Sequence, residues 1–285
     1  MGKLLKPAIA AVEHEFNYAR PDFEAVRALL YKLTGIRLAD SKDSMVYSRL
    51  VRRIRALKLT SFADYLLYLQ QHAKEKEQFI NALTTNLTSF FREPHHFEML
   101  ARYLQAHPEC RRIWCAASST GEEPYSIAMV VVETFGRFDV PIEIIATDID
   151  SQVLQKAQAG VYSEERIQSL DERRCKQFFF RGTGTKSGLV KVVPELRKMV
   201  SFHQLNLLDP KWFIQDTVDI IFCRNVMIYF DKPTQLKILA RMVSLLPPEG
   251  LYIAGHSENF SHATSLVKSI GQTVYLPTVT RGKHG

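Results

Sequence analysis

The sequence predicts an α/β protein in which a helical N-terminal domain is followed by a parallel sheet covered by helices. Two observations lead to this prediction. Residues 21–86 carry apolar side chains at helical spacing, and after about Pro108 short apolar runs alternate with amphipathic helical stretches. Strands that alternate with helices form parallel sheets through crossover connections. We therefore expect a helical domain at 1–86 and a sheet domain at 87–285.

Three helices are expected in the first domain, each with an apolar stripe. Gly35 sits where the first would end, and Ser61 could cap the third. The stripes consist of Phe23, Val26, Leu29 and Leu30; of Val46, Leu50, Ile54 and Leu57; and of Tyr65, Leu66 and Leu69.

The alternation in the second domain gives its expected elements in chain order. Strands are predicted at 112–117, 142–147, 200–205, 218–222, 251–254 and 272–277, and helices at 124–135, 151–159 and 233–246. Residues 178–180 and 189–193 instead flank a glycine-rich turn, which indicates a β-hairpin subdomain inserted at about 176–200. A glycine-rich phosphate loop is disfavoured there, because a strand rather than a helix follows the glycines.

Composition favours a globular cytoplasmic protein. The chain is 46% hydrophobic and 24% charged, no apolar run is long enough to span a bilayer, and no secretory signal pattern is found. The four cysteines lack metal-ligand spacing, so we predict no metal, and a reducing compartment fits them best. The formal net charge is +7, and residues 1–86 hold 14 Lys+Arg against 9 Asp+Glu. A basic surface of this kind suits nucleic acid, anionic lipid or an acidic protein.

Polar side chains follow several of the predicted strands. Arg224, Asn225 and Tyr229 come directly after the strand at 218–222, and Asp148 ends the strand at 142–147. Asn206 follows another strand, although a lone asparagine there is weak evidence. Ligands of open α/β sheets bind outside the carboxyl ends of the strands, and an acid at this position commonly accepts hydrogen bonds from ribose. Asp148 could instead cap the next helix, a role for which Asp150 competes.

The loop at 117–124 lies where doubly wound folds bind a cofactor, but it lacks the G-x-G-x-x-G pattern. Acids at its helix start would repel phosphate. Helix capping by Ser119 or Thr120 explains the loop equally well. With the acid at Asp148, these features favour a cationic nucleoside without phosphate, and S-adenosylmethionine is such a compound. The segment at 86–94, with Phe90 and Phe91 next to Arg92, is on its residues alone better explained as core plus surface.

Five strings of the sequence together resemble the CheR-type chemotaxis receptor methyltransferases. They are NALTTNLTSFFRE, SSTGEEPYSIA, ATDID, FCRNVMIYF and AGHSENF, and the likeness runs from about Phe23 to Tyr275. The resemblance implies a Rossmann-like class I methyltransferase domain that uses S-adenosylmethionine and releases S-adenosylhomocysteine. It also implies methylation of glutamates on the cytoplasmic helical bundle of chemoreceptors, recruitment to membrane receptor arrays, and an inserted β-subdomain that can grip a receptor's C-terminal tail.

Carried over position by position, the resemblance implies a set of site residues. Tyr229 would lie beside the transferred methyl group, and we expect Arg92 to orient the incoming carboxylate because a guanidinium matches it bidentately. A glutamate is already ionised near neutral pH, so no general base is required. The implied cofactor contacts are Asn86, Thr88, Arg92, Glu123, Asp148, Asn206, Leu207, Arg224 and Asn225.

A run of arginines on the predicted second helix suggests a docking surface for the acidic substrate. Arg49, Arg52, Arg53 and Arg55 belong to it, and the first three are expected on one face opposite the apolar stripe. A solvated helix face is the alternative. Two other functions remain: a receptor-associated S-adenosylmethionine sensor without turnover, and a nucleic-acid methyltransferase, which would need stacking and base-reading residues that we do not find.

Overall fold

The structure, a computed structural model, describes residues 15–278; the ends of the two expected domains, 1–14 and 279–285, lie outside the described residues. The helices are α1 (Arg20–Thr34), α2 (Asp43–Ala56), α3 (Phe62–Gln71), α4 (Ala73–Leu83), α5 (His95–Ala106), α6 (Glu122–Phe135), α7 (Ser151–Ala159), α8 (Glu172–Phe178), α9 (Pro194–Lys198) and α10 (Lys232–Val243). The strands are β1 (Arg112–Cys115), β2 (Glu143–Asp148), β3 (Val161–Ser163), β4 (Phe179–Arg181), β5 (Leu189–Val192), β6 (Val200–Gln204), β7 (Ile220–Cys223), β8 (Leu251–Ala254), β9 (Val267–Gly271) and β10 (Val274–Pro277).

The chain divides into two compact units. One comprises the residues up to Leu30 together with Leu38–Leu83, and the other comprises Tyr31–Arg37 and the residues from Thr84 onward. None of the helices within 15–278 has the length and apolar character that crossing a bilayer requires.

The first unit is helical, as its apolar stripes predict. Phe23, Val46, Leu50 and Tyr65 are fully buried, because the stripes face one another. Ser61 caps α3, as expected, by accepting a hydrogen bond from the Asp64 N–H. The helical spacing of the sequence therefore predicted the buried side chains of α1, α2 and α3. Helix α4, with its buried Phe79 and Leu83, was not among the three expected helices.

Arg49, Arg52 and Arg53 all lie on α2 (Asp43–Ala56), as expected, but α4 covers part of the face that they share. Arg53 donates to both carboxylate oxygens of Glu75, at 2.9 and 2.6 Å, and Arg49 donates to the Ala82 carbonyl at 3.1 Å. The Glu75 carboxylate is 7% exposed, so it needs a cation beside it. Only Arg52 of these three is exposed, and the adjacent Arg55 is exposed but paired with Glu15.

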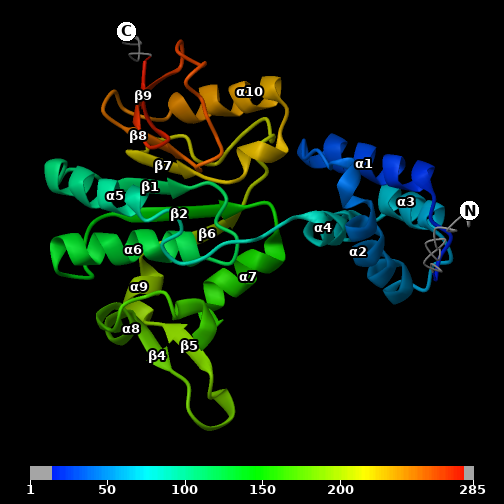
Figure 1. The fold of residues 1–285 in the computed structure, drawn as a ribbon, viewed down its shortest axis with the longest axis horizontal. Coiled ribbons are helices and arrows are strands. Elements are labelled where there is room, and N and C mark those ends of the chain that lie inside the picture. The colour runs from blue at the N-terminus through cyan, green and yellow to red at the C-terminus, as the bar shows by residue number, and fades with distance from the viewer. Residues whose placement is uncertain (1–14, 279–285) are drawn as a thin grey trace, which may run out of the picture. The chain divides into compact units, whose positions relative to one another are not determined.

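The second unit is built on a seven-stranded sheet in the order β6-β2-β1-β7-β8-β10-β9. The first five of these strands are parallel to one another, as the strand–helix alternation predicts, and β10 and β9 are antiparallel additions. Figure 1 shows β6, β2, β1, β7 and β8 stacked in this order from bottom to top. Strand β9 was not predicted, because only its first residue, Val267, is buried.

Helices cover both faces of this sheet, which places its core in two layers. One layer joins Ile113, Ile144 and Phe222 of the strands to side chains of α5 and α6. The other joins Trp114, Ile221 and Tyr252 to side chains of α10. Successive strand residues point to opposite faces, so apolar runs without alternation are required here.

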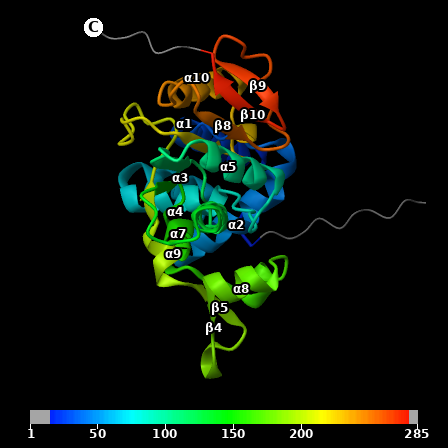
Figure 2. The same cartoon turned by 90° about the vertical axis from the view of Figure 1, so that its left-hand side faces the viewer.

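The inserted subdomain forms a separate three-stranded antiparallel sheet in the order β3-β5-β4. The expected hairpin is present as β4 and β5, which pair antiparallel. The third strand, β3, pairs with the other side of β5 and was not predicted. Figures 1 and 2 both show β4, β5 and α8 together at the end of this unit away from β8 and β9.

Candidate active site

The candidate site lies at the carboxyl ends of four neighbouring strands. Because β6, β2, β1 and β7 are adjacent and parallel, the segments that follow them meet at one edge of the sheet. These segments carry Asn206 after β6, Asp148 at the end of β2, Glu123 after β1, and Arg224 after β7. The sheet order therefore gathers the predicted site residues from four distant parts of the sequence.

The loop between β1 and α6 approaches Asp148 and the segment before α5. Ser119, at a left-handed φ of 47°, donates its N–H to Asp148 Oδ2 at 2.8 Å and its hydroxyl to the Asn86 carbonyl at 3.0 Å. Helix α6 begins after Gly121, and no side chain caps it. The alternative in which Ser119 or Thr120 serves as a helix cap is therefore wrong.

Asp148 does not cap the following helix, because its neighbour Asp150 does. Asp150 Oδ1 accepts the N–H groups of Gln152 and Val153, at 2.9 and 3.3 Å. Asp148 instead accepts the N–H of Ser119 at 2.8 Å and that of Asp150 at 2.9 Å. Burial raises the pKa of Asp148 to about 6, although the N–H donors act in the opposite direction.

Asn86 is anchored to the same strand end through Asp150. Its side-chain amide donates to Asp150 Oδ2 at 2.8 Å, and the buried Thr84 hydroxyl donates to the same oxygen at 2.8 Å. Thr88, two residues along, is half-buried. The segment leading to Arg92 is thus fixed to the turn between β2 and α7, so the interpretation of this segment as core plus surface does not describe it fully.

Arg224 connects Glu123 with the backbone of Arg92. Its guanidinium donates to Glu123 Oε2 at 2.6 Å and to the Arg92 carbonyl, and lies 3.2 Å from Glu93 Oε2. The Arg224 side chain is fully buried, so its charge depends on these carboxylates. Arg92 itself is half-buried and donates to the Leu87 carbonyl at 3.0 Å. One buried cation therefore holds Glu123 close to the backbone of Arg92.

Asn225 and Tyr229 lie on the turn that follows Arg224. Asn225 has a φ of 57° and donates its N–H to Glu258 Oε2 at 2.8 Å, while its amide lies 3.4 Å from Glu93 Oε1. Tyr229 is half-buried, and its carbonyl accepts the Arg37 N–H at 2.8 Å. This turn is therefore held from two sides by groups distant in sequence.

Asn206 and Leu207 follow β6. The Asn206 amide donates to the Leu33 carbonyl at 2.9 Å, and its Oδ1 accepts the Leu208 N–H at 3.0 Å. The Leu207 side chain is buried. The short segment Tyr31–Arg37 thus fixes both Asn206 and Tyr229 within this unit.

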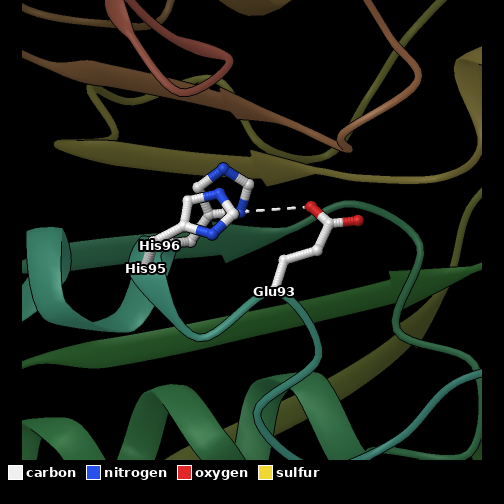
Figure 3. Close-up of side chains that lie close together, drawn as sticks. All are labelled: Glu93, His95 and His96. Carbon is white, nitrogen blue, oxygen red and sulfur yellow. Dashed lines mark ion pairs between the residues drawn. The ribbon is translucent and has the colours of Figure 1, made fainter.

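Glu93, His95 and His96 form a cluster whose possible ligand atoms lie within 4.8 Å of one another, and Figure 3 shows His96 facing Glu93. His96 Nε2 is 2.8 Å from the Gln272 carbonyl and therefore carries a hydrogen, which leaves Nδ1 facing Glu93 Oε2 at 3.4 Å. Burial, with a further contribution from Arg224, lowers the pKa of His96 to about 4. Since Arg224 occupies the same carboxylate oxygen, it competes directly with any cation. The absence of a metal remains a prediction.

Several side chains that organise the site were not singled out from the sequence. Glu258 lay inside one of the recognised strings without an assigned role, and Glu93 ended another. Thr84 was similarly placed. The available signal was an acid close to a predicted strand end, which does not specify the backbone groups that it binds.

The donors and acceptors present fit a cationic nucleoside better than a dinucleotide. Glu122 and Glu123 are buried in the first turn of α6, where a phosphate would otherwise be expected, and the buried Ser118 hydroxyl has no hydrogen-bond partner among residues 15–278. Asp148 carries carboxylate oxygens at a strand end, where acids of such folds commonly accept ribose hydroxyls. The fold and this site define a Rossmann-like methyltransferase that uses S-adenosylmethionine.

Comparison with known proteins identifies the family. Residues 86–276 match the model of the CheR methyltransferase, SAM binding domain, and residues 21–84 match that of the CheR methyltransferase, all-alpha domain. The chain is 58% identical over 267 residues to chemotaxis protein methyltransferase 2 of Pseudomonas aeruginosa, covering 92% of this chain and 95% of the relative. It is 51% identical over 255 residues to the chemotaxis protein methyltransferase of Escherichia coli K12, covering 89% of each. The chain belongs to the CheR methyltransferase family.

Likeness to solved structures is weaker. The structure of PKMT2 from Rickettsia typhi in complex with AdoHcy matches with a TM-score of 0.32 and 16% identity, over 51% of this chain and 21% of that one. A likeness of this size carries no further argument.

Proposed function

We propose that the protein methylates glutamate side chains of chemotaxis receptors, giving glutamate methyl esters and S-adenosylhomocysteine. Family membership and the names of the relatives, chemotaxis protein methyltransferases, support the class of substrate. The structural observation that carries the proposal is the Arg224 bridge. It places Glu123, an expected cofactor contact, next to the backbone of Arg92, the expected carboxylate contact.

The reaction requires alignment of the carboxylate with the methyl group, and it requires no proton transfer. S-adenosylmethionine supplies an electrophilic methyl group on a sulfonium. A glutamate, with a pKa of about 4.3, is already a carboxylate near neutral pH, so the protein needs no general base. Its contribution is to hold nucleophile and methyl carbon in line, which can lower a barrier by about 7–11 kcal/mol in the best cases.

Arg92 and Tyr229 are the residues that we assign to the acceptor. The Arg92 guanidinium has five donors, of which one is directed to the Leu87 carbonyl, so donors remain for a carboxylate. Tyr229 offers a hydroxyl to the same carboxylate or its ring face to a cation. The cofactor contacts that we assign are Asn86, Thr88, Arg92, Glu123, Asp148, Asn206, Leu207, Arg224 and Asn225.

The receptor would also contact surfaces of the enzyme that are distant from the reacting atoms. We assign Arg52 and Arg55 of α2 to the docking of an acidic helical bundle, since both are exposed. The small sheet offers a second site, because β4 is an edge strand with Phe180 57% exposed, and an extended tail peptide could pair with such an edge. Such contacts would recruit the enzyme to membrane receptor arrays.

Methyl transfer from labelled S-adenosylmethionine to receptor fragments tests the proposal. We expect label on the receptor that alkali releases as methanol, which is the behaviour of a carboxyl ester. Base-stable label, or label on nucleic acid, would indicate a different methyltransferase. Binding of S-adenosylhomocysteine without any transfer would indicate a sensor.

Removing the Arg92 guanidinium should lower kcat. For Arg92→Ala we expect a loss of tenfold or more, because the carboxylate loses its charged donors, with partial recovery in Arg92→Lys. The matched control is Arg102→Ala on α5, an exposed arginine outside the site. A kcat for Arg92→Ala equal to that of the control would remove Arg92 from the reacting groups.

A further inference from the structure

The inserted subdomain contacts the loop at 117–124, which we call the cofactor loop, through two side chains. The Tyr162 hydroxyl of β3 donates to the Thr120 carbonyl at 2.7 Å. Arg166, in the 3-10 turn Glu164–Ile167 that follows β3, donates to Glu122 Oε1 at 2.5 Å. The Thr120 hydroxyl donates to the other oxygen of Glu122 at 2.6 Å. The two residues of the loop that are contacted, Thr120 and Glu122, therefore lie within three residues of Glu123 in the sequence.

The Glu122 carboxylate requires this contact. Its side chain is fully buried, whereas that of Arg166 is 40% exposed. A carboxylate removed from water without a cation is costly, so loss of Arg166 would leave an uncompensated charge in the first turn of α6. Among residues 15–278, Arg166 is the only basic side chain that forms a salt bridge with Glu122.

The backbone at Gly121 shows how closely the loop and the subdomain approach. Gly121 has a φ of 97°, and a Cβ there would lie 2.9 Å from both the Tyr162 hydroxyl and Ala157 Cβ. On its other side the loop donates the Ser119 N–H to Asp148. The loop is thus held between the end of β2 and the small sheet.

The same subdomain also supports the segment that carries Arg92. Phe90 makes edge-to-face contacts with Tyr162 and Phe179, with ring centroids 5.1 and 5.5 Å apart. The Arg174 guanidinium lies 4.0 Å from the ring centroid of Phe91 and pairs with Glu133 of α6 at 2.8 and 2.9 Å. Phe91 needs this support, because it is a non-glycine residue at a φ of 51°.

We propose that Tyr162 and Arg166 are positioning residues for the cofactor loop. The inserted subdomain then has two functions: it binds partners, and it sets the affinity for S-adenosylmethionine. The inference rests on the proposed use of this site for that cofactor. Its chemical basis is the Arg166–Glu122 pair, which fixes the start of α6 and with it Glu123. A subdomain that served only to recruit substrate would not need a cation at the first turn of α6.

Calorimetry with S-adenosylhomocysteine on the full chain tests the proposal without any receptor. Arg166→Gln should weaken binding by about tenfold, Tyr162→Phe by a smaller factor, and Arg166→Lys should retain most of the affinity. Arg173→Gln is the matched control, since Arg173 is exposed on α8 of the same subdomain. Wild-type affinity in Arg166→Gln would overturn the proposal, even if receptor methylation were impaired.

A double-mutant cycle separates positioning from general destabilisation. If Arg166 acts through Glu122, the loss of affinity in Arg166→Gln combined with Glu122→Gln should be well below the sum of the single losses. The proposal would be contradicted if the losses of affinity were additive, or if they simply followed the decrease in the thermal unfolding midpoint of each variant. If the variants bind S-adenosylhomocysteine normally, the coupling between subdomain and loop is contradicted. If no chain, wild type included, methylates receptors, the proposed function is contradicted. The two failures are therefore distinguishable.

Discussion

At the scale of single residues, Asp148 should govern the pH dependence of cofactor binding. Burial raises its pKa from the ordinary value of 3.8 to about 6. Between these two values the native state binds more protons than the unfolded chain, so this residue makes the native state less stable as the pH rises. Above pH 6 the carboxylate is charged and accepts hydrogen bonds more strongly.

We therefore expect S-adenosylhomocysteine to bind several-fold more tightly at pH 7.5 than at pH 5, because a charged acceptor favours the ribose hydroxyls. Asp148→Asn should bind more weakly at pH 7.5 and lose most of this pH dependence. Calorimetric titrations of both proteins across this range provide the measurement. An unchanged pH profile in Asp148→Asn would assign the dependence to another group.

At the scale of elements, the turn after β7 depends on one buried carboxylate. Glu258, 4% exposed, accepts the N–H groups of Asn225, Met227 and Gly255 at 2.8, 2.7 and 2.7 Å. A Cβ on Gly255 would lie 2.4 Å from the Asn225 amide nitrogen, so the turn and the end of β8 are in close contact. Burial raises the pKa of Glu258, yet these three N–H groups oppose the shift.

Glu258→Gln should destabilise the protein by about 1–3 kcal/mol, because an amide offers one oxygen where two oxygens accept now, and a buried N–H loses its partner. Affinity for S-adenosylhomocysteine should fall with it, since Asn225 moves. Urea unfolding and calorimetry measure the two effects. Glu249→Gln, at a side chain that is 79% exposed in the turn before β8, is the control, and equal stability of the two variants would refute the role of Glu258.

Which elements the sequence predicts follows from how many buried residues each contains. β1, β7 and β8 lie between covered faces, so they appear as continuous apolar runs. β3 is only three residues long with Tyr162 alone buried, and no periodicity can mark it. α5 could have been found, because Phe97, Leu100 and Leu104 recur at helical spacing after Pro94.

The site was predictable as a set of strand ends but not as a network. Parallel strands bring their carboxyl ends together, which suffices to group Glu123, Asp148 and Arg224. The partners of these groups depend on which loops meet in space. The fully buried Arg224 was predicted as a cofactor contact, whereas the structure shows its guanidinium directed to Glu123, Glu93 and the Arg92 carbonyl.

At the scale of the whole molecule, the chain crosses between its two units more than once. Residues Tyr31–Arg37 belong to the unit that holds the site, although the residues on both sides of them belong to the helical unit. Within the site unit, Gly35 has a φ of 71°, and a Cβ there would lie 2.5 Å from Leu208 Cδ1. A boundary drawn at one position, such as residue 86, therefore separates Asn206 and Tyr229 from a segment that fixes them.

The docking surface that we assign to the helical unit gives a prediction for the full enzyme. Arg52 is exposed and forms no salt bridge with the residues between 15 and 278, whereas Arg53 is committed to Glu75. Arg52→Glu should raise the KM for receptor several-fold by placing like charges together, and should leave the affinity for S-adenosylhomocysteine unchanged.

Arg53→Glu should act differently, because it sets two carboxylates against each other inside the unit and lowers stability.

Lys74→Glu on α4 is the control for Arg52→Glu, since it changes the net charge equally at another exposed position. The difference in KM between Arg52→Glu and this control should shrink in high salt, where exposed charges are screened within about 3–10 Å. If Lys74→Glu raises KM as much as Arg52→Glu does, the net charge of the unit attracts the receptor and the arginines of α2 form no specific docking surface.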